Sequence, residues 1–436
     1  MDNDEFLRFL SQAQDHADED IFLAQAAAVI ILLAGIIQAK QRKIQQRNPS
    51  RLYLCRAQLL PDPRANTPWQ KLWESQDDRA FITTMGIDVA TFRLLLEGPN
   101  GFGESWSCTP IPRLDVSTMG QPRLGARSLD AAGALGMTLH YLGSAMLEVS
   151  LQQIFALIPS TVSRYLAFSK MILLARLRRM EEASIHLPRT PEEYAADSDL
   201  ICVRHPLLEG AFGSIDGLSL PAQEAEDPEI ENATYNGWKS SHCINNVLAF
   251  SPRGVIIDAA LNAPGSWHDA HVARPIFERL RVQVPDGYFL VADTAFPRGT
   301  ASIAGKIRAA MKGGERIPAE QRAQEEFLRF DRQLLSYRQT AEWGMRMMQG
   351  SFGRLRVPLP INDASARQQL LELCVRLANV RTNCVGLNEI RKVYFKTWKE
   401  SEDERLWTNL GEMMFGDIRR HDRVSRFHVV VASDET

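Results

Sequence analysis

Apolar positions recur at helical spacing through most of the first 182 residues. Residues 1–60 are predicted to be helical, and 128–182 is predicted to contain three helices in succession. Pro159-Ser160 separates the third helix from the second. The stretch 61–127 is rich in Pro and Gly and is expected to be mostly irregular, with short helical patterns at Trp69–Trp73 and Ile87–Leu96.

From residue 208 the pattern changes to short apolar runs that turn residues separate. Four strands are predicted, at 210–220, 242–251, 255–261 and 287–292. A helix is expected at 268–280, and helical patterns dominate 300–355 and 364–381. Three strands close in sequence, a helix, a strand and further helices predict an α/β domain, with a mixed sheet flanked by helices as in ribonuclease H-like folds.

These patterns also predict the domain organisation. The composition of 183–207, with Pro188, Pro191 and several acidic residues, is typical of a polar linker. The expected segments are an N-terminal helical and irregular region (1–127), a helix-turn-helix-like domain (128–182), the linker (183–207), the α/β domain (208–385) and a C-terminal tail (386–436).

Composition and charge narrow the classes of function. The chain has 436 residues, 45% of them apolar and 24% charged, as in ordinary globular proteins. Its formal net charge is −3, whereas a chain that binds DNA strongly by itself is usually basic. DNA contact would therefore depend on local basic patches or on a partner protein. The six cysteines form no CxxC pair, so they are interpreted as thiols of a reducing compartment.

The segment Ile21–Ala39 is almost wholly apolar and reaches the lower range of length for a membrane span. Gln25 and Gln38 interrupt it, and its alanines contribute little to insertion into a bilayer. We therefore expect a helix buried against the rest of the protein or against a second copy, and no membrane partner. A monomer and a homodimer remain alternatives, and a membrane-tethered protein is the competing interpretation.

Three carboxylates stand in local patterns that favour metal binding. Asp216 and Asp293 each end a run predicted as a strand, and Glu342 lies within a long helical pattern. Carboxylates at strand ends point into the crevice where open α/β sheets bind ligands. Taken alone, an aspartate at a strand end is equally explained as a turn or cap residue. The rivals of Glu342 as the third carboxylate are Glu325, Glu326 and Asp331.

Four short motifs occur in order along the α/β domain. They are Gly213-Ser-Ile-Asp-Gly217, Gly265-Ser-Trp-His-Asp269, Ala292-Asp-Thr-Ala-Phe-Pro297, and Ala341-Glu-Trp-Gly344 followed by Phe352-Gly-Arg-Leu355. Together they resemble the DDE endonuclease domain of PIF/Harbinger transposases and their nuclease-like relatives, over about 208–385. The resemblance implies an RNase H-like core, DNA as substrate, a separate basic DNA-binding partner and two Mg²⁺ or Mn²⁺ ions. The metal-binding catalytic triad that it implies is Asp216, Asp293 and Glu342.

The sequence departs from the family pattern in two places. Residues 343–351 separate Glu342 from the Phe-Gly pair that usually follows the glutamate directly. Ala295-Phe296-Pro297 stands where an aromatic residue and a glycine normally follow the second aspartate. Arg338, one helical turn before Glu342, is expected to pair with it or with a phosphate, and this favours Glu342 over its rivals.

Other residues near these motifs have two interpretations each. Asp269 is either a fourth metal ligand or the cap of the helix that begins there. Lys239 and His242 precede the second strand, where they could neutralise a phosphate near the metals or belong to a solvated loop.

The predicted helices at 128–182 provide a candidate DNA reader. In a helix-turn-helix, the N-terminal residues of the second helix of the motif contact the bases of the major groove. Here these residues are Ser160, Thr161, Ser163 and Arg164, and Arg178 belongs to a supporting basic run. Three-helix bundles also occur as plain packing modules, so this alternative stays open.

The sequence therefore predicts a metal-dependent DNA endonuclease or transposase that hydrolyses phosphodiester bonds with two metal ions. The alternative is a domesticated, catalytically weak DNA-binding or scaffold protein of transposase origin. A DNA substrate places the expected site of action in the nucleus of a eukaryotic cell, after synthesis in the cytoplasm.

Overall fold

The computed structural model describes residues 62–112, 120–297, 303, 305–312 and 317–394. All of them belong to one unit, Arg56–Thr436. The segment Ile21–Ala39, the helix expected within 1–60 and most of the expected tail lie outside the described residues. Of the helices in the described ranges, none is both long enough and apolar enough to cross a membrane.

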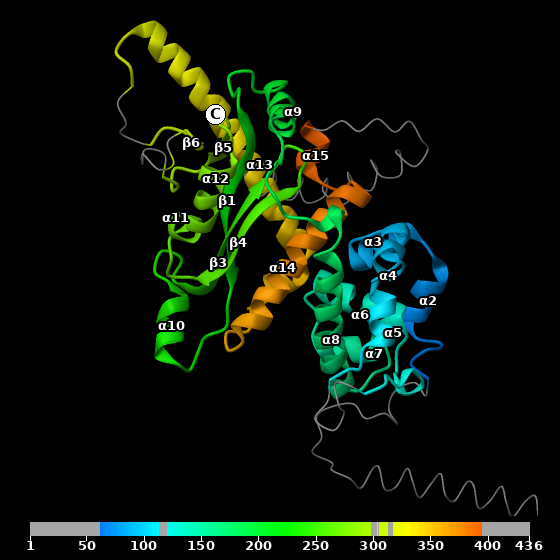
Figure 1. Ribbon diagram of the computed structural model, residues 1–436. Helices are drawn as coiled ribbons and strands as arrows, with labels where there is room; N and C mark the ends of the chain where they lie inside the picture. Colours follow the sequence, from blue (N-terminus) through cyan, green and yellow to red (C-terminus); the bar gives the residue numbers. More distant parts are fainter. Residues whose placement is uncertain (1–61, 113–119, 298–302, 304, 313–316, 395–436) are drawn as a thin grey trace, which may run out of the picture. The chain divides into compact units, whose positions relative to one another are not determined.

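Seven helices make up the N-terminal part of the described chain (Figure 1). They are α2 (Pro68–Ser75), α3 (Asp78–Met85), α4 (Val89–Leu96), α5 (Phe102–Cys108), α6 (Ala131–Gly143), α7 (Glu148–Ile154) and α8 (Pro159–Leu177). The last three confirm the helices predicted within 128–182. The expectation that 61–127 is mostly irregular is wrong, because four short helices lie there.

Side-chain caps explain why these short helices form. The side chains of Thr67, Asp77 and Asp88 each accept a hydrogen bond from the backbone N–H three residues later, at the starts of α2, α3 and α4. Such a cap satisfies an N–H that has no partner within the helix, and it contributes about 1 kcal/mol. The helical patterns predicted at Trp69–Trp73 and Ile87–Leu96 are confirmed as α2 and α4, whereas the eight-residue α3 was not predicted.

The helical region packs around Trp69 of α2, which is buried. Its ring stacks on Phe155, with the ring centroids 5.6 Å apart. On α6, a Cβ atom at Gly136 would lie 2.2 Å from the Trp69 ring. The close approach of α2 to α6 therefore requires glycine at this position.

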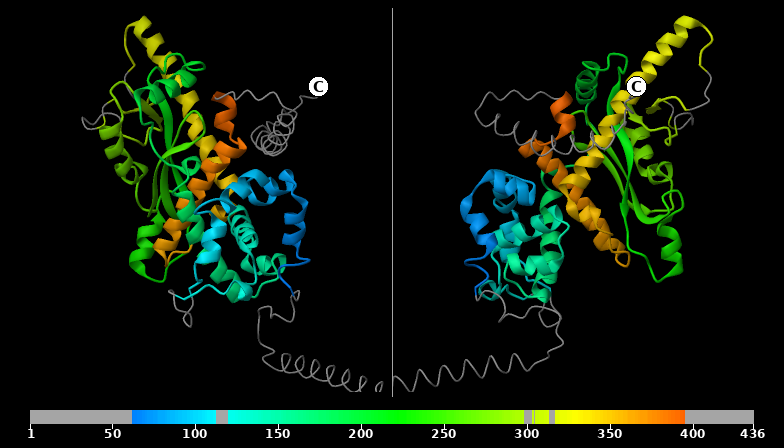
Figure 2. Two further views of the ribbon diagram at one scale, coloured as in Figure 1. Left: turned by 45° about the vertical axis from the view of Figure 1, so that its right-hand side comes forward. Right: turned by 180° about the vertical axis from the view of Figure 1, so that it is seen from behind.

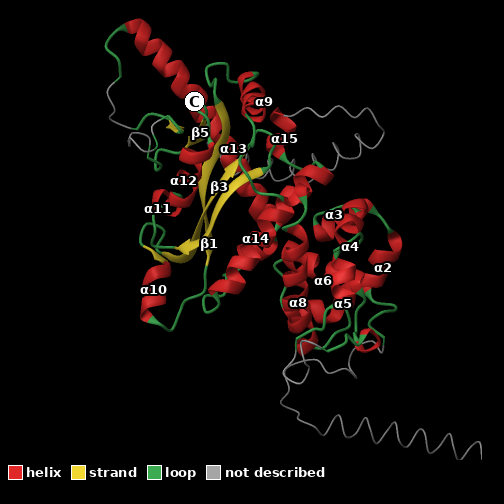
Figure 3. Cartoon of the chain, viewed as in Figure 1, coloured by secondary structure: helices red, strands yellow, loops and turns green. Residues whose placement is uncertain are grey.

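The second half of the chain builds a six-stranded mixed sheet (Figure 3). Its strands are β1 (Ala211–Pro221), β2 (Tyr235–Asn236), β3 (Ser241–Phe250), β4 (Ile256–Pro264), β5 (Phe289–Ala292) and β6 (Ile307–Ala309). The order is β2-β3-β1-β5-β6, with β4 also paired to β3. β1, β3 and β4 are antiparallel neighbours, while β1, β5 and β6 run parallel. The predicted mixed sheet is confirmed.

Helices cover both faces of the sheet (Figure 2). On one face, α11 (Asp269–Val272) and α12 (Arg274–Gln283) bury Val272, Ile276 and Leu280 against Ile215 and Val247. The other face is covered by α13 (Gln321–Ser351) and α14 (Ala364–Val380). On that side the apolar core is continuous with the core of the helical region, and α8 packs along α14.

Several elements differ from the sequence prediction. The expected linker contains α9 (Pro191–Cys202), which Thr190 caps by accepting from the N–H of Glu193. The single helix expected at 268–280 is divided into α11 and α12. β6 occupies a position where helices were expected. The remaining short helices are α10 (Pro228–Thr234) and α15 (Glu389–Tyr394).

Strand β4 lies at an edge of the sheet, and side chains of α14 hold its backbone. Asn379 accepts from the N–H of Ile256 (2.8 Å) and donates to its carbonyl oxygen (2.9 Å). Further along, Asn262 has a φ of +66° and interrupts the regular pairing with β3. Arg367 donates to the side chain of Asn262, whose amide donates to the carbonyl of Ala364.

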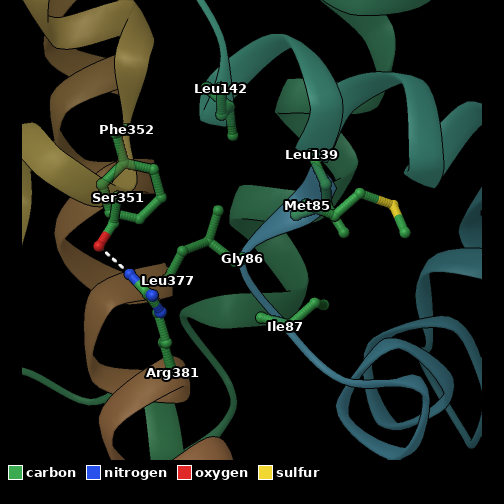
Figure 4. A pocket seen from close by; sticks show the side chains of 9 residues that line it. All are labelled: Met85, Gly86, Ile87, Leu139, Leu142, Ser351, Phe352, Leu377 and Arg381. Carbon is green, nitrogen blue, oxygen red and sulfur yellow. Dashed lines mark hydrogen bonds between the residues drawn. The ribbon is translucent and has the colours of Figure 1, made fainter. Parts of the chain in front are cut away.

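The helical region meets the ends of α13 and α14 around a cavity of about 10 Å³, the size of one water molecule (Figure 4). Arg381 follows α14 and is buried there, and it donates to the hydroxyl of Ser351 at the end of α13. Burial lowers the pKa of Arg381 to about 10, so the guanidinium stays charged at neutral pH. The other walls of the cavity are apolar apart from backbone: Met85, Gly86, Ile87, Leu139, Leu142, Phe352 and Leu377.

Candidate active site beside strands β1 and β5

Asp216 and Asp293 are brought side by side by the sheet. β1 and β5 run parallel, and their last paired residues are Ile215 and Ala292, directly before the two aspartates. Neighbouring strands are about 4.8 Å apart, so the two carboxylates start from adjacent backbone positions. Asp293 follows the end of β5 as predicted. Asp216 does not end its strand, because β1 continues to Pro221 along β3, and the aspartate lies where β1 parts from β5.

Helix α13 covers the face of the sheet toward which Asp216 points. Side chains two residues apart on a strand share a face. Ser214, two residues before Asp216, is hydrogen-bonded to Thr340 of α13 at 2.7 Å. The approach is close at Gly344, where a Cβ atom would lie 2.5 Å from the ring of Phe250 on β3. Glu342 lies between Thr340 and Gly344 on this helix.

Arg338 connects the second aspartate to the glutamate. Its guanidinium donates to Glu342 Oε1 at 2.8 Å, and Nη1 lies 3.8 Å from Asp293 Oδ1. The predicted pairing of Arg338 with Glu342 one turn later is confirmed. The charge of Arg338 also acts on Asp216, where it opposes the larger increase in pKa that burial causes. Arg338 therefore interacts with Asp216, Asp293 and Glu342.

Asp269 lies on the other side of Asp216. A Cβ atom on Gly217 would be 2.5 Å from the Asp269 carboxyl carbon, so glycine is what allows this carboxylate to approach β1. Asp269 is the first residue of α11, whose N-cap is His268, and it is therefore not the helix cap. Burial raises its pKa, the charges of Lys239 and His268 lower it, and Asp293 raises it. Its role as a fourth metal ligand stays a prediction.

The electrostatics of Asp216 favour a cation nearby. Its pKa is raised from 3.8 to about 6: burial is the largest cause, the N–H of Gly217 acts in the opposite direction, and the charges of Asp293 and Asp269 contribute to the increase. Carboxylate oxygens are the ligands that Mg²⁺ and Mn²⁺ prefer. Within the described ranges, no three acidic, His or Cys side chains converge closely enough to form a ready-made site for one ion. The donor chemistry and the excess negative charge fit a divalent metal, and its binding would require the side chains to move together.

The rivals of Glu342 lie elsewhere on α13. Glu326 is sixteen residues earlier, about 24 Å along the helix at 1.5 Å per residue, and Glu325 is one residue further still. Glu326 forms an exposed ion pair with Arg322. Asp331 accepts from the backbone N–H of Met311, beyond β6. Among these carboxylates, Glu342 is the one that shares Arg338 with Asp293.

The candidate DNA-reading residues begin α8, the second helix of an α7–turn–α8 motif. Ala156 in the turn has a φ of +51°. Ser160 and Ser163 are exposed, whereas Thr161 and Arg164 are half-buried. Ser163 donates to Glu148 of α7 at 2.7 Å, which fixes the two helices to each other. Their contact with DNA stays a prediction.

Two of the proposed DNA contacts are occupied by contacts within the protein. Arg178 donates to both carboxylate oxygens of Glu372 on α14, at 2.9 and 2.6 Å. His242 lies 2.9 Å from Glu231 of α10 and is only 14% exposed. These side chains join elements of the fold, and the contact of Arg178 and His242 with DNA stays a prediction. A partner far away in sequence gives no local signal, which is why sequence reasoning missed these contacts.

Lys239 lies on the turn between β2 and β3, and its contact with a phosphate stays a prediction. Burial raises the pKa of Asp269 and of Cys243, and the charge of Lys239 acts against burial at both. The next residue toward the N-terminus, Trp238, was not singled out from the sequence. Trp238 stands out by the exposure of its side chain, which only the structure shows.

Comparison with known proteins agrees with this geometry. Residues 215–379 match the family model described as DDE superfamily endonuclease. No curated protein and no solved structure matches the chain significantly. The matched segment contains Asp216, Asp293 and Glu342. This part of the chain is similar to DDE transposase-type nucleases, and its mixed sheet flanked by helices is an RNase H-like nuclease core. The match does not distinguish PIF/Harbinger from other branches of the superfamily.

Proposed function

We propose that this protein is a metal-dependent DNA endonuclease of the transposase type, related to PIF/Harbinger transposases. One observation carries the proposal: Asp216 and Asp293 start from adjacent positions on parallel strands, and Arg338 ties Asp293 to Glu342, all within the segment that matches DDE endonucleases. Asp269 is added as a further candidate ligand because Gly217 lets it approach Asp216.

The residues of the candidate site would have different roles. Asp216, Asp293, Glu342 and Asp269 would hold two Mg²⁺ or Mn²⁺ ions through their oxygens. Bound in this way, divalent ions activate a water molecule and stabilise the leaving 3′ oxygen of a phosphodiester. Lys239 would neutralise a phosphate of the bound strand, and Arg338 would keep Asp293 and Glu342 in register.

The rest of the proposal concerns partners and location. The net charge of −3 supports a separate basic DNA-binding partner, and a homodimer is the alternative source of additional DNA contacts. Action on chromosomal DNA places the protein in the nucleus of a eukaryotic cell, with the cytoplasm as its site of synthesis.

The test of catalysis is the nicking of supercoiled plasmid with Mg²⁺. Wild-type protein is expected to nick, and Glu342→Gln is expected to lose more than about 100-fold in rate, since even outer partners of metal ligands contribute about 10- to 100-fold. Glu326→Gln is the matched control on the same helix and should nick like the wild type. Equal nicking by wild type and Glu342→Gln would remove Glu342 from the triad.

One observation favours a second candidate, a DNA-binding protein that has lost catalysis. Arg338 contacts Glu342 directly and lies near Asp293, so a cation of the protein itself already offsets part of the negative charge. Under this interpretation wild-type protein binds DNA but does not nick plasmid with Mg²⁺ or Mn²⁺. The nicking assay therefore decides between the two candidates.

DNA binding through α8 predicts a change in salt dependence. Arg164→Ala should weaken binding and reduce the slope of log K against log salt by about 0.9, the value for one lost phosphate contact on duplex DNA. Lys71→Ala, which removes an exposed cation of α2 that pairs with Glu74, is the control. Fluorescence anisotropy titrations between low and moderate salt measure both slopes. If Arg164→Ala leaves the slope unchanged, the start of α8 does not contact the phosphate backbone.

A further inference from the structure

The turn between β2 and β3 presents a tryptophan to solvent. Trp238 is 95% exposed, whereas most large apolar side chains of the described chain are buried. Its neighbours on the turn, Gly237, Lys239 and Ser240, carry no apolar side chain. Two further aromatic rings lie close to the turn in the chain and on the loop bonded to it, Tyr235 and Trp267, each 44% exposed, so Trp238 is the most exposed of the three.

The turn is held in a defined conformation. The side-chain oxygen of Asn236 accepts from the backbone N–H groups of Trp238 and Lys239, both at 3.1 Å. The amide of the same asparagine donates to the carbonyl of Gly265 at 2.8 Å. Gly265 is itself packed tightly, because a Cβ atom there would lie 2.2 Å from the carbonyl oxygen of Cys243. The backbone that carries Trp238 is thus attached to the loop leading into α11.

This attachment places the turn at the border of the candidate active site. The loop from Gly265 continues to Asp269, which contacts Gly217 beside Asp216. Lys239 is the residue after Trp238 on the same turn, so the backbone that Asn236 attaches to this loop carries a cation as well as the ring. α10 and α11 flank the start of β3, from which the turn projects (Figure 3).

The surroundings favour a nucleobase over other ligands. Protein-binding and membrane-binding surfaces are contiguous apolar patches, whereas the residues on either side of Trp238 are Gly237 and Lys239. Proteins that hold single-stranded nucleic acid combine cations for the phosphates with aromatic side chains for the bases. Lys239 and Trp238 provide one of each on adjacent residues. The other exposed rings here are already packed: Trp267 against His271, with ring centroids 4.3 Å apart, and Tyr235 against His242, at 5.3 Å.

We propose that Trp238 stacks on an unpaired base of the DNA strand whose phosphate lies against Lys239 and the carboxylates. The inference rests on the proposed function for the identity of the strand, and it adds a base-binding position that the carboxylates do not supply. An unpaired base is required because the faces of paired bases are covered by their neighbours in the duplex.

Tryptophan fluorescence with oligothymidylate tests the proposal without any metal. The full-length protein, in buffer with a chelator, is titrated with a thymidine oligonucleotide. In wild type the emission should be quenched on binding, and Trp238→Phe should remove this component while it keeps the affinity within about threefold. Trp238→Ala should weaken binding about tenfold, in line with the energy of one base–aromatic stack. Trp267→Phe is the matched control and should keep both the quenching and the affinity.

Each result decides for or against the inference. Equal quenching in wild type and Trp238→Phe, or equal affinity in wild type and Trp238→Ala, would overturn it. An emission shift of Trp238 with phosphatidylserine vesicles but none with the oligonucleotide would also overturn it, in favour of a membrane contact. Because Trp238 is exposed, unchanged thermal unfolding should show that the variants fold.

The proposed catalysis and the proposed base-binding position can be disproved independently of each other. If wild type shows the Trp238-dependent quenching but does not nick plasmid with Mg²⁺, the base-binding position stands and the endonuclease proposal falls. If wild type nicks plasmid while Trp238→Phe is quenched like the wild type, the endonuclease proposal stands and the base-binding position falls.

Discussion

Asp216→Asn is expected to abolish Mg²⁺-dependent cleavage and, in the metal-free protein, to raise the stability of the fold. The loss of cleavage follows because a neutral amide is a poor ligand for a hard divalent cation. The gain in stability follows because burial and the neighbouring Asp293 and Asp269 disfavour the ionised carboxylate in the folded state. The N–H of Gly217, at 2.8 Å from Asp216 Oδ1, can still bond to the asparagine oxygen.

The sign and pH window of the stability change follow from the pKa values. The pKa of Asp216 is about 6 in the folded protein against an ordinary value of 3.8. Folding therefore binds a proton between these values, and wild type loses stability as the pH rises through that window. Asparagine has no such loss. The variant should match wild type below about pH 4 and exceed it by up to about 3 kcal/mol above about pH 6.

Thermal unfolding at pH 4 and pH 7 measures this difference, with a chelator present. When Mg²⁺ replaces the chelator, the melting temperature of wild type should rise but that of Asp216→Asn should not, because only a protein that binds the ion in its folded state is stabilised by it. A variant that is less stable than wild type at pH 7 without metal would contradict the destabilising effect assigned to the ionised carboxylate of Asp216. A variant that nicks plasmid normally would contradict its role as a ligand.

Gly344→Ala should destabilise the fold by about 1–3 kcal/mol, although alanine is the better helix former. The added Cβ atom would lie 2.5 Å from the ring of Phe250, which is fully buried and has no space into which to move. Helix α13 would have to retreat from β3. Because Glu342 lies two residues before Gly344, cleavage should fall together with stability.

Gly350→Ala on the same helix is the matched control. A Cβ atom there meets nothing within 4 Å, so the substitution should stabilise the protein by up to about 1 kcal/mol through helix propensity. Urea unfolding of both variants gives changes of opposite sign if the contact with Phe250 limits the approach of α13. Changes of the same sign would show that helix propensity outweighs packing at both positions.

The strands and the long helices could be predicted from local patterns. β1, β3, β4 and β5 are apolar runs between turn residues, and α6, α8, α13 and α14 bury apolar positions at helical spacing. The elements that were missed are short or were assigned by composition. β6 has three residues, and α9 begins in a proline-containing, acidic segment that looks like a linker until the cap at Thr190 is considered.

The candidate site could be predicted only in part, for a physical reason. The pairing of Arg338 with Glu342 follows from their spacing on one helix turn. By contrast, the contact of Asp269 with Gly217 and the pair of Arg178 with Glu372 join residues far apart in sequence, and only the packed fold brings them together. The exposure of Trp238 likewise depends on where the turn projects, which no local pattern records.

The edge of β4 has a consequence for how copies of this chain can associate. An exposed edge strand ordinarily offers its N–H and C=O groups to a strand from another molecule. Here the side chain of Asn379 is hydrogen-bonded to both the N–H and the C=O of Ile256. At Asn262, where the pairing with β3 is interrupted, Arg367 of α14 donates a hydrogen bond to the asparagine side chain. Joining two sheets across this edge would break these bonds. A dimer that extends the sheet across β4 is therefore disfavoured, and the same hydrogen bonds protect this edge from edge-to-edge aggregation.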